Sequence, residues 1–171
     1  GYVAAIEKAV LNAENLGAKK GDKLGLGVKT TIANSKDASA DAVGVAQAYT
    51  NYAAATYDAE DKITSCFIDA SQTNINFDTE GKLTTALDAA FKTKQELKED
   101  YGMKGISTIG KEWYEQANAM AAYVTGKTVE EVKGIALTEG RPAADTELAA
   151  TVTVHVTDYI EVIEKSAVEI R

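Results

Sequence analysis

Residues 43–77 constrain the fold of this chain more than any other stretch. The segments 49–57 and 63–67 carry β-branched and aromatic residues near a two-residue period, which is typical of half-buried strands. The acidic segment Asp58-Ala59-Glu60-Asp61 separates them where a hairpin connection would lie. The stretch therefore predicts two adjacent strands joined by a turn. It predicts a sheet and indicates no reaction.

The composition is that of a folded globular chain. Of the 171 residues, 45% are hydrophobic and 26% are charged, so the chain can bury one sizeable core, and we expect one domain over residues 1–171. The net charge of −8 argues against nucleic acid as a partner, because affinity for the phosphate backbone comes largely from Lys and Arg. No apolar run approaches the roughly 20 residues of a bilayer-spanning helix, so we expect membrane contact only through an anchor outside this chain.

Helices are predicted before and after this sheet along the sequence. Apolar residues at helical spacing predict a helix over residues 2–16, before Gly17, and another over residues 108–125. Residues 24–32 alternate loosely as a first strand, and a closing helix is expected from about Asp158. This order indicates an α+β fold in which an antiparallel sheet packs against several helices.

Local signals mark the remaining boundaries. Thr93 with Glu96, and Thr128 with Glu131, have the spacing of capping boxes, in which a hydroxyl and a carboxylate satisfy free backbone N–H groups. Each pair predicts the start of a short helix. Pro142, the only proline, marks a loop.

The two ends of the chain resemble each other. Residues 2–10 match residues 159–167, with Tyr, Ile, Glu and Lys kept in register. One interpretation is a tandem array in which residues 1–16 are the terminal helix of a preceding copy of the same domain. The other is a coincidence between two amphipathic helices.

Residue types that carry chemistry are few. His155 is the only histidine and no nucleophile is located beside it, which favours a structural role. Cys66 is the only cysteine, which excludes an internal disulfide and argues against zinc; in a predicted strand it is interpreted as a small buried hydrophobe. The acidic groups in the two turns lack the ligand spacing of a calcium loop and predict solvated turns; they are Asp58, Glu60 and Asp61 in the first, and Asp78 and Glu80 in the second. We therefore expect no catalytic residue and no metal.

Aromatic residues cluster in sequence around the central helix. Tyr101, Trp113, Tyr114 and Tyr123 could form one wall of a site for a small planar ligand. Core packing is the favoured interpretation, because an aromatic residue at helical spacing among apolar residues is usually buried.

Three segments together resemble a known family. These are the strand, acidic turn and Lys-Ile strand of residues 54–67, the Tyr-Val-Thr-Gly-Lys-Thr-Val-Glu-Glu-Val stretch of residues 123–132, and the Ala-Thr-Val-Thr stretch of residues 150–153 before the last helix. The order is similar to the FMN-binding domain of extracytoplasmic bacterial flavoproteins and lipoproteins, and the likeness covers most of residues 23–170. It is closest to uncharacterised lipoproteins of anaerobic bacteria, some of which carry the domain in tandem.

The resemblance implies two cofactor-binding residues. In flavin-carrying members a Ser-Gly-Ala-Thr-type motif receives the FMN phosphate in ester linkage to its threonine. Thr151 and Thr153 match the Ala-Thr-x-Thr portion, whereas Leu148 and Ala149 replace the Ser-Gly. Loss of the glycine removes the tight backbone turn, so any FMN is expected to be held without a covalent bond. An alternative interpretation makes both threonines β-branched residues that end a strand ahead of a helix.

These observations lead to two functional hypotheses. The first is a non-enzymatic binding domain of an exported, lipid-anchored cell-surface protein, with FMN as its ligand and electron transfer as its role. The second is a structural or interaction module of a tandem-repeat surface protein that has lost flavin binding, with a neighbouring copy of the same domain as its partner. A hydrolase has no support, because any two of the 26 acidic residues could converge by chance.

Overall fold

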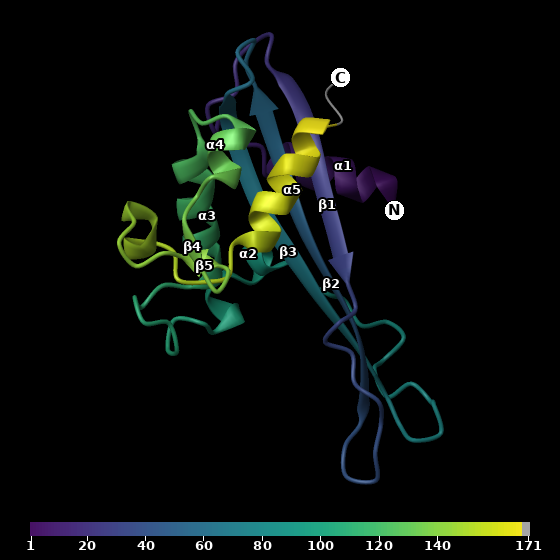
Figure 1. Cartoon of the computed structure of the whole chain (residues 1–171). Helices are drawn as coiled ribbons and strands as arrows, with labels where there is room; N and C mark the ends of the chain where they lie inside the picture. The colour runs from purple at the N-terminus through teal and green to yellow at the C-terminus, as the bar shows by residue number, and fades with distance from the viewer. Residues whose placement is uncertain (169–171) are drawn as a thin grey trace.

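A computed structural model describes residues 1–168 and has the predicted α+β fold. Three strands form an antiparallel sheet in the order β1 (Lys23–Thr31), β2 (Gly44–Tyr57) and β3 (Ile63–Phe77). Helices and loops of the C-terminal half cover one face of this sheet, and α1 (Tyr2–Leu11) lies on the other side (Figure 1). No helix in the described part of the chain is long and apolar enough to cross a membrane.

The hairpin of β2 and β3 forms as predicted, and its acidic turn is structural. Asp58 Oδ1 accepts hydrogen bonds from the backbone N–H groups of Glu60, at 3.0 Å, and Lys62, at 2.8 Å. Asp78 makes the same pair of bonds in the turn after β3. Each carboxylate therefore closes its own turn, which is the ordinary use of Asp at such positions. β3 continues past the predicted segment to Phe77.

Two helices cover one face of the sheet. α5 (Thr157–Val168) lies across β1 and β2, and α3 (Trp113–Val124) packs against β3. The rings of Trp113 and Tyr159 meet between the two helices, with centroids 5.9 Å apart and planes at 90°. This edge-to-face pair stabilises the contact beyond the burial of its area. Both helices were predicted, but α3 begins at Trp113 and not near residue 108.

The late start of α3 has a local cause. Glu112 is buried, and its carboxylate accepts hydrogen bonds from the backbone N–H groups of Met103, at 2.8 Å, and Lys104, at 2.9 Å. Its own N–H group donates to Glu115 Oε2 at 2.8 Å, which closes the first turn of α3. Ile109, assigned to the helix by its spacing, therefore lies in a loop that Glu112 holds.

α1 is shorter than predicted. It ends at Leu11, its C-cap is Asn12, and Gly17 is not part of the cap. The N–H group of Gly17 instead donates to Asn15 Oδ1 at 3.0 Å. Asparagine side chains of this kind compete with the helical hydrogen bonds, so the chain leaves the helix as soon as they appear.

Both capping boxes are confirmed. α2 (Lys94–Leu97) begins after Thr93 and α4 (Val129–Lys133) begins after Thr128, each with the reciprocal bonds of the motif. α2 continues into the 3-10 turn η1 (Lys98–Tyr101), whose C-cap is Gly102 in the left-handed conformation, with φ 76°.

The segment 149–156 is not the strand end that its threonines suggested. It begins in a 3-10 turn, η2 (Glu147–Ala150), and residues 151–156 belong to no strand. Leu148, Val152 and Val156 are buried, but Ala150 between the first two is exposed, whereas a half-buried strand would bury every second residue.

A small hairpin precedes this segment. β4 (Leu137–Thr138) pairs with β5 (Arg141–Pro142), so Pro142 lies in a two-residue strand and not in the predicted loop. Proline is tolerated there because β5 is an edge strand with no further neighbour in its sheet.

The second face of the main sheet is largely uncovered. Leu26 of β1, Ala54 of β2 and Phe67 of β3 lie side by side on it. Leu24 is 72% exposed and Phe67 is 42% exposed, so apolar side chains on this face reach solvent. The core therefore lies between the opposite face and the helices, where the predicted buried Cys66 is found.

The contact of α5 with β1 generates a stability prediction. A Cβ atom on Gly27 would overlap the carbonyl oxygen of Val162 and lie 2.9 Å from the backbone nitrogen of Ser166. Because neither backbone group can rotate away, Gly27→Ala is expected to lower the free energy of unfolding by at least about 2 kcal/mol, measured by urea denaturation.

Gly105→Ala is the matched control, because a Cβ atom there would meet no atom within 4 Å. It should change the free energy of unfolding by no more than about 0.5 kcal/mol. Equal effects of the two substitutions would contradict the close approach of α5 to β1.

Candidate functional site

One cavity lies where the segment after β5 meets the loop before α3. Its volume is about 440 Å³, within the range of small-molecule sites. The lining combines one cation, several hydroxyl groups and apolar side chains, contributed by Thr108, Ile109, Arg141, Pro142, Ala144, Thr146, Ala149, Ala150, Val152 and Thr153. We refer to it as the Arg141 cavity. Apolar walls with a few polar groups are the usual make-up of a ligand site.

The β4–β5 hairpin positions Arg141. Its turn places Glu139 and Gly140 at φ values of 50° and 78°, the left-handed region that glycine adopts without cost. The carbonyl oxygen of Gly140 accepts a hydrogen bond from the N–H group of Val156 at 2.8 Å. A Cβ atom on Gly140 would lie 2.9 Å from His155 Nδ1, so glycine also permits the hairpin to pack closely on this segment.

The guanidinium of Arg141 is available to a ligand. Arg141 is exposed and forms no ion pair with any carboxylate of residues 1–168. Arginine remains charged and presents donors in a planar fork that fits phosphate. Within the described part of the chain, the cavity therefore has one cation at its edge without an ion-pair partner.

Gln116 forms the polar support beneath the cavity. It is fully buried on α3, and its Oε1 accepts hydrogen bonds from the N–H group of Thr153, at 2.8 Å, and from Thr153 Oγ1, at 3.2 Å. Its Nε2 donates to Ser107 Oγ at 3.2 Å and to the carbonyl oxygen of Lys111 at 3.3 Å. One amide thus joins the two chain segments that form the cavity wall. Nothing in the sequence distinguished this glutamine from an exposed one.

The structure separates the two predicted cofactor residues. Thr153 lines the cavity, whereas Thr151 does not line it and is exposed, with its hydroxyl donating to the carbonyl oxygen of Leu148 at 3.2 Å. The Thr153 hydroxyl donates to Gln116, so its proton is directed into the protein and only its lone pairs face a ligand. An amide oxygen does not remove a proton, so Gln116 does not activate this hydroxyl as a nucleophile.

The aromatic residues divide between the core and the surface. Trp113 is only 3% exposed, which confirms core packing and leaves no ring face for a planar ligand. The Tyr114 hydroxyl donates to Glu99 at 2.9 Å, and Lys127 Nζ lies 4.0 Å from the centroid of the Tyr123 ring. The rings are therefore used within the protein and do not form a common wall.

Lys94 is the most unusual charged residue of the fold. It is only 4% exposed, although it begins the short helix α2. Its Nζ lies 4.7 Å from the Tyr49 ring, 4.5 Å from the Tyr101 ring and 5.2 Å from the Trp113 ring, and it donates to the Tyr49 hydroxyl at 2.9 Å. Three aromatic faces thus replace the water that a lysine usually requires.

The enclosure changes the proton affinity of the groups inside it. Burial lowers the pKa of Lys94 to about 8, and the negative charge of Asp69 opposes that shift. Burial also raises the pKa of Asp69, although hydrogen bonds from Thr93 and from backbone N–H groups oppose this increase. Lys94 lines neither of the two cavities described here, so we interpret it as an anchor of α2 to the sheet and α3.

A second cavity, of about 350 Å³, lies on the extended end of the hairpin. Its amide side chains satisfy one another: Gln47 accepts from Asn34 at 3.1 Å and donates to Asn74 at 2.9 Å. The amides are therefore a ladder that stabilises the hairpin, and the cavity is the weaker candidate for a ligand site.

The other residues with potential chemistry are dispersed. Among residues 1–168, no group of three or more His, Cys, Asp or Glu side chains could hold a metal ion. His155 is exposed beside the β4–β5 turn and lies outside the Arg141 cavity. Burial raises the pKa of the Cys66 thiol to about 12, which keeps it protonated and unreactive at neutral pH.

The buried ammonium generates a prediction on the pH dependence of stability. The pKa of Lys94 in the folded chain, about 8, lies below its ordinary value of 10.5, so the unfolded chain binds more protons between these pH values. The free energy of unfolding contributed by Lys94 therefore rises with pH from about 8 to about 10.5. Cys66, with its pKa raised from 9.0 to about 12, has the opposite effect above about pH 9.

Comparison of the parent chain with Lys94→Met isolates the contribution of the lysine to the pH dependence of stability, because both chains contain Cys66. Urea denaturation at pH 7.5, 8.5 and 9.5 should show a more positive slope of stability against pH in the parent. Lys20→Met, which removes an exposed ammonium, should keep the parental slope. Identical slopes in the parent and in Lys94→Met would refute the enclosed state of the lysine.

Comparison with known proteins gives one partial match to report. No protein-family model matches the chain, and no solved structure matches it significantly. Chlorophenol reductase of Desulfitobacterium hafniense is 49% identical over 43 residues, which are 25% of this chain and 13% of that protein. The similarity is therefore that of a short segment within a longer protein.

Proposed function

We propose that this chain is a non-enzymatic binding domain that holds FMN without a covalent bond in the Arg141 cavity. The observation that carries the proposal is an arginine that no carboxylate of residues 1–168 pairs with, on a cavity whose wall includes Thr153, one of the two threonines that match the FMN motif. An anionic phosphate and an apolar ring system together match a lining of one cation, hydroxyl groups and aliphatic side chains.

Each part of the cavity has a separate task in this proposal. Arg141 pairs with the phosphate, and the exposed hydroxyl of Thr108 can donate a further hydrogen bond. Ile109, Ala144 and Ala150 supply apolar surface for the ring. Gln116 keeps Thr153 and the loop at residues 107–111 at a fixed separation. Bound FMN would supply electron transfer, which the protein side chains do not.

One further observation supports a redox context, and the family resemblance supports a location. The relative from Desulfitobacterium hafniense is named a reductase, and reductases transfer electrons. The FMN-binding domain that the chain resembles occurs in exported bacterial proteins, so the proposal includes an extracytoplasmic, lipid-anchored location with the anchor outside these residues.

A second candidate function is a structural or interaction module that has lost flavin binding. It is favoured by the apolar residues of the uncovered sheet face, among them Leu24, Leu26 and Phe67. Exposed apolar side chains grouped on one surface are typical of protein contacts.

Titration of FMN against the purified chain, followed by quenching of flavin fluorescence, tests the first function. We expect saturable binding in the micromolar range, and Arg141→Gln should weaken it about tenfold or more, because a charge-assisted contact with phosphate is lost. Thr151→Ala should leave the affinity unchanged, since Thr151 lies outside the cavity.

Riboflavin, which lacks the phosphate, is the matched ligand control. It should bind more weakly than FMN, and Arg141→Gln should not alter its affinity. Lys20→Gln removes an exposed positive charge from residues outside the cavity and should not weaken FMN binding. No binding of FMN at 100-fold higher concentration, or equal loss in the Arg141 and Lys20 variants, would reject the proposed site in favour of the second function.

A further inference from the structure

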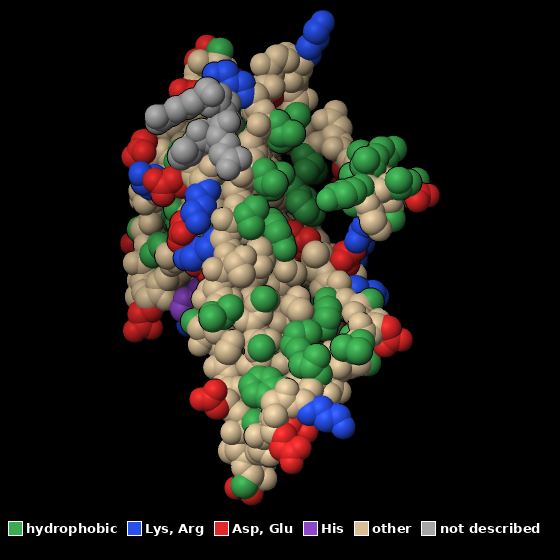
Figure 2. All heavy atoms as spheres, turned by 90° about the vertical axis from the view of Figure 1, so that its right-hand side faces the viewer, with side chains coloured by type: hydrophobic (Ala, Val, Ile, Leu, Met, Phe, Trp, Pro, Cys, Tyr) green, Lys and Arg blue, Asp and Glu red, His purple; other side chains and the backbone are tan. Residues whose placement is uncertain are grey.

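α1 is an apolar helix that contributes no residue to the core formed by residues 1–168. It has ten residues, and none of them is buried. Tyr2 is 93% exposed and Ile6 is 65% exposed, and Val3, Val10 and Leu11 are exposed as well. Figure 2 shows these hydrophobic side chains projecting at the upper right, apart from the body of the molecule.

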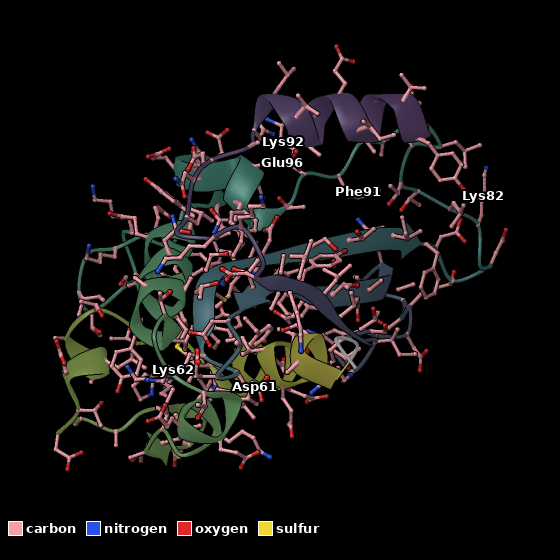
Figure 3. The ribbon with its side chains drawn as sticks, turned by 90° about the horizontal axis from the view of Figure 1, so that it is seen from above. Asp61, Lys62, Lys82, Phe91, Lys92 and Glu96 are labelled. Carbon is pink, nitrogen blue, oxygen red and sulfur yellow. The ribbon has the colours of Figure 1, made fainter. Side chains whose placement is uncertain are left out.

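Its one ion pair does not explain its composition. Lys8 contacts Glu96 of α2, and Figure 3 shows Glu96 on the side of α2 that is nearest to α1. A helix of ten residues is marginal in water without tertiary contacts, because nucleation is costly and few hydrogen bonds follow. The apolar side chains of α1 therefore need a surface that this fold does not provide.

α5 shows what such a surface looks like, because its sequence resembles that of α1 over residues 159–167 and 2–10. Four residues of α5 are buried against the sheet and α3, namely Tyr159, Val162, Ile163 and Ser166. Their counterparts in the alignment of residues 2–10 with 159–167 are Tyr2, Ala5, Ile6 and Ala9. Every buried position of this segment of α5 thus has an apolar counterpart in α1.

The remaining positions agree with the same register. Ile160 and Ala167 of α5 are half-buried, and their counterparts are Val3 and Val10. The charged residues fall at the same two positions, since Glu7 and Lys8 match Glu164 and Lys165. In α5 both side chains lie outside the buried face, and Glu164 pairs with Lys133 at 3.0 Å. The correspondence therefore extends from sequence to the burial pattern of the helix.

We propose that α1 is the closing helix of a preceding copy of this fold, and that it packs on the β1–β2 surface of that copy as α5 packs here. Residues 12–168 then form one repeat of a tandem array. α1 and α5 lie on opposite sides of the sheet, so α1 does not compete with α5 for the surface that α5 covers (Figures 1 and 3). The proposal does not depend on flavin binding.

The size of the side chains supports the assignment. α5 approaches the sheet so closely at Gly27 that a Cβ atom has no room. The counterparts of Val162 and Ser166 in α1 are alanines, which permit an equally close approach. Tyr2 would occupy the place of Tyr159, whose ring meets Trp113.

A tandem chain tests the proposal. Residues 12–158 are joined directly to residues 2–171, so that Tyr2 follows Asp158 as Tyr159 does in the natural chain. Since α1 buries no residue here, its absence from the start of the first unit removes no core contact. We expect two folded units, with the backbone N–H groups of α1 protected from hydrogen exchange at least tenfold more than in the 171-residue chain.

Two adjacent substitutions provide the matched control. Ala5→Glu places a carboxylate at the counterpart of buried Val162, and Ala4→Glu places it at the counterpart of Glu161. In the tandem chain Ala5→Glu should abolish the protection of α1 and the thermal transition of the first unit, whereas Ala4→Glu should preserve both. In the 171-residue chain neither should shift the thermal midpoint, because both alanines are exposed.

Three outcomes would overturn the proposal. The first uses a comparison chain in which residues 12–168 are followed by residues 12–171, so that its first unit retains α5. The proposal fails if this comparison chain folds completely while the first unit of the chain closed by α1 is unfolded. The second is an equal effect of the two substitutions in the tandem chain. The third is loss of stability with Ala5→Glu in the 171-residue chain, which would place α1 on the uncovered sheet face of its own copy.

Discussion

The close approach of α5 to the sheet is the contact on which the rest of the structure depends. Gly27 of β1 pairs with Ala53 of β2, and these small residues allow the helix backbone to rest almost directly on the strands. Tyr159 then reaches Trp113, which joins α5 to α3. Because residues 151–156 lead into α5, the position of this helix also determines where Thr153 meets Gln116. One helix-to-sheet distance thus determines both the core and the cavity wall.

Buried polar side chains connect this core to the surrounding loops. Glu112 holds the loop at residues 103–104, Gln116 holds residues 107–111 and Thr153, and Lys94 holds α2 against three rings. A polar group taken out of water is costly unless its partners are all present, so each anchor tolerates only one arrangement of its loop. The walls of the Arg141 cavity have defined positions for this reason, although they contain little regular secondary structure.

The sequence predicts those features whose causes are local. The strands follow from their two-residue period, and the starts of α2 and α4 follow from capping boxes that span four residues. The start of α3 was missed because its capping pair, Glu112 and Glu115, lacks the hydroxyl residue of the usual signal, and the burial of Lys94 was missed because partners such as Tyr49 are distant in sequence. Thr153 of the threonine motif lines the cavity, whereas Arg141 and Gln116 come to it through tertiary packing, which leaves no pattern in a single sequence.

The proposed ligand site and the proposed repeat are physically connected. Thr153 lies four positions before Thr157, where α5 begins, so the cavity wall and the closing helix form one continuous segment. A ligand that binds only when this wall is ordered stabilises the docked helix by mass action. If α1 closes a preceding copy in the same way, that copy's cavity segment leads into α1 and from there through residues 12–22 to β1 of the next copy. Binding in one repeat would then hold in place the helix from which the next repeat departs, and linkage requires that docking of that helix increases affinity for the ligand to the same extent.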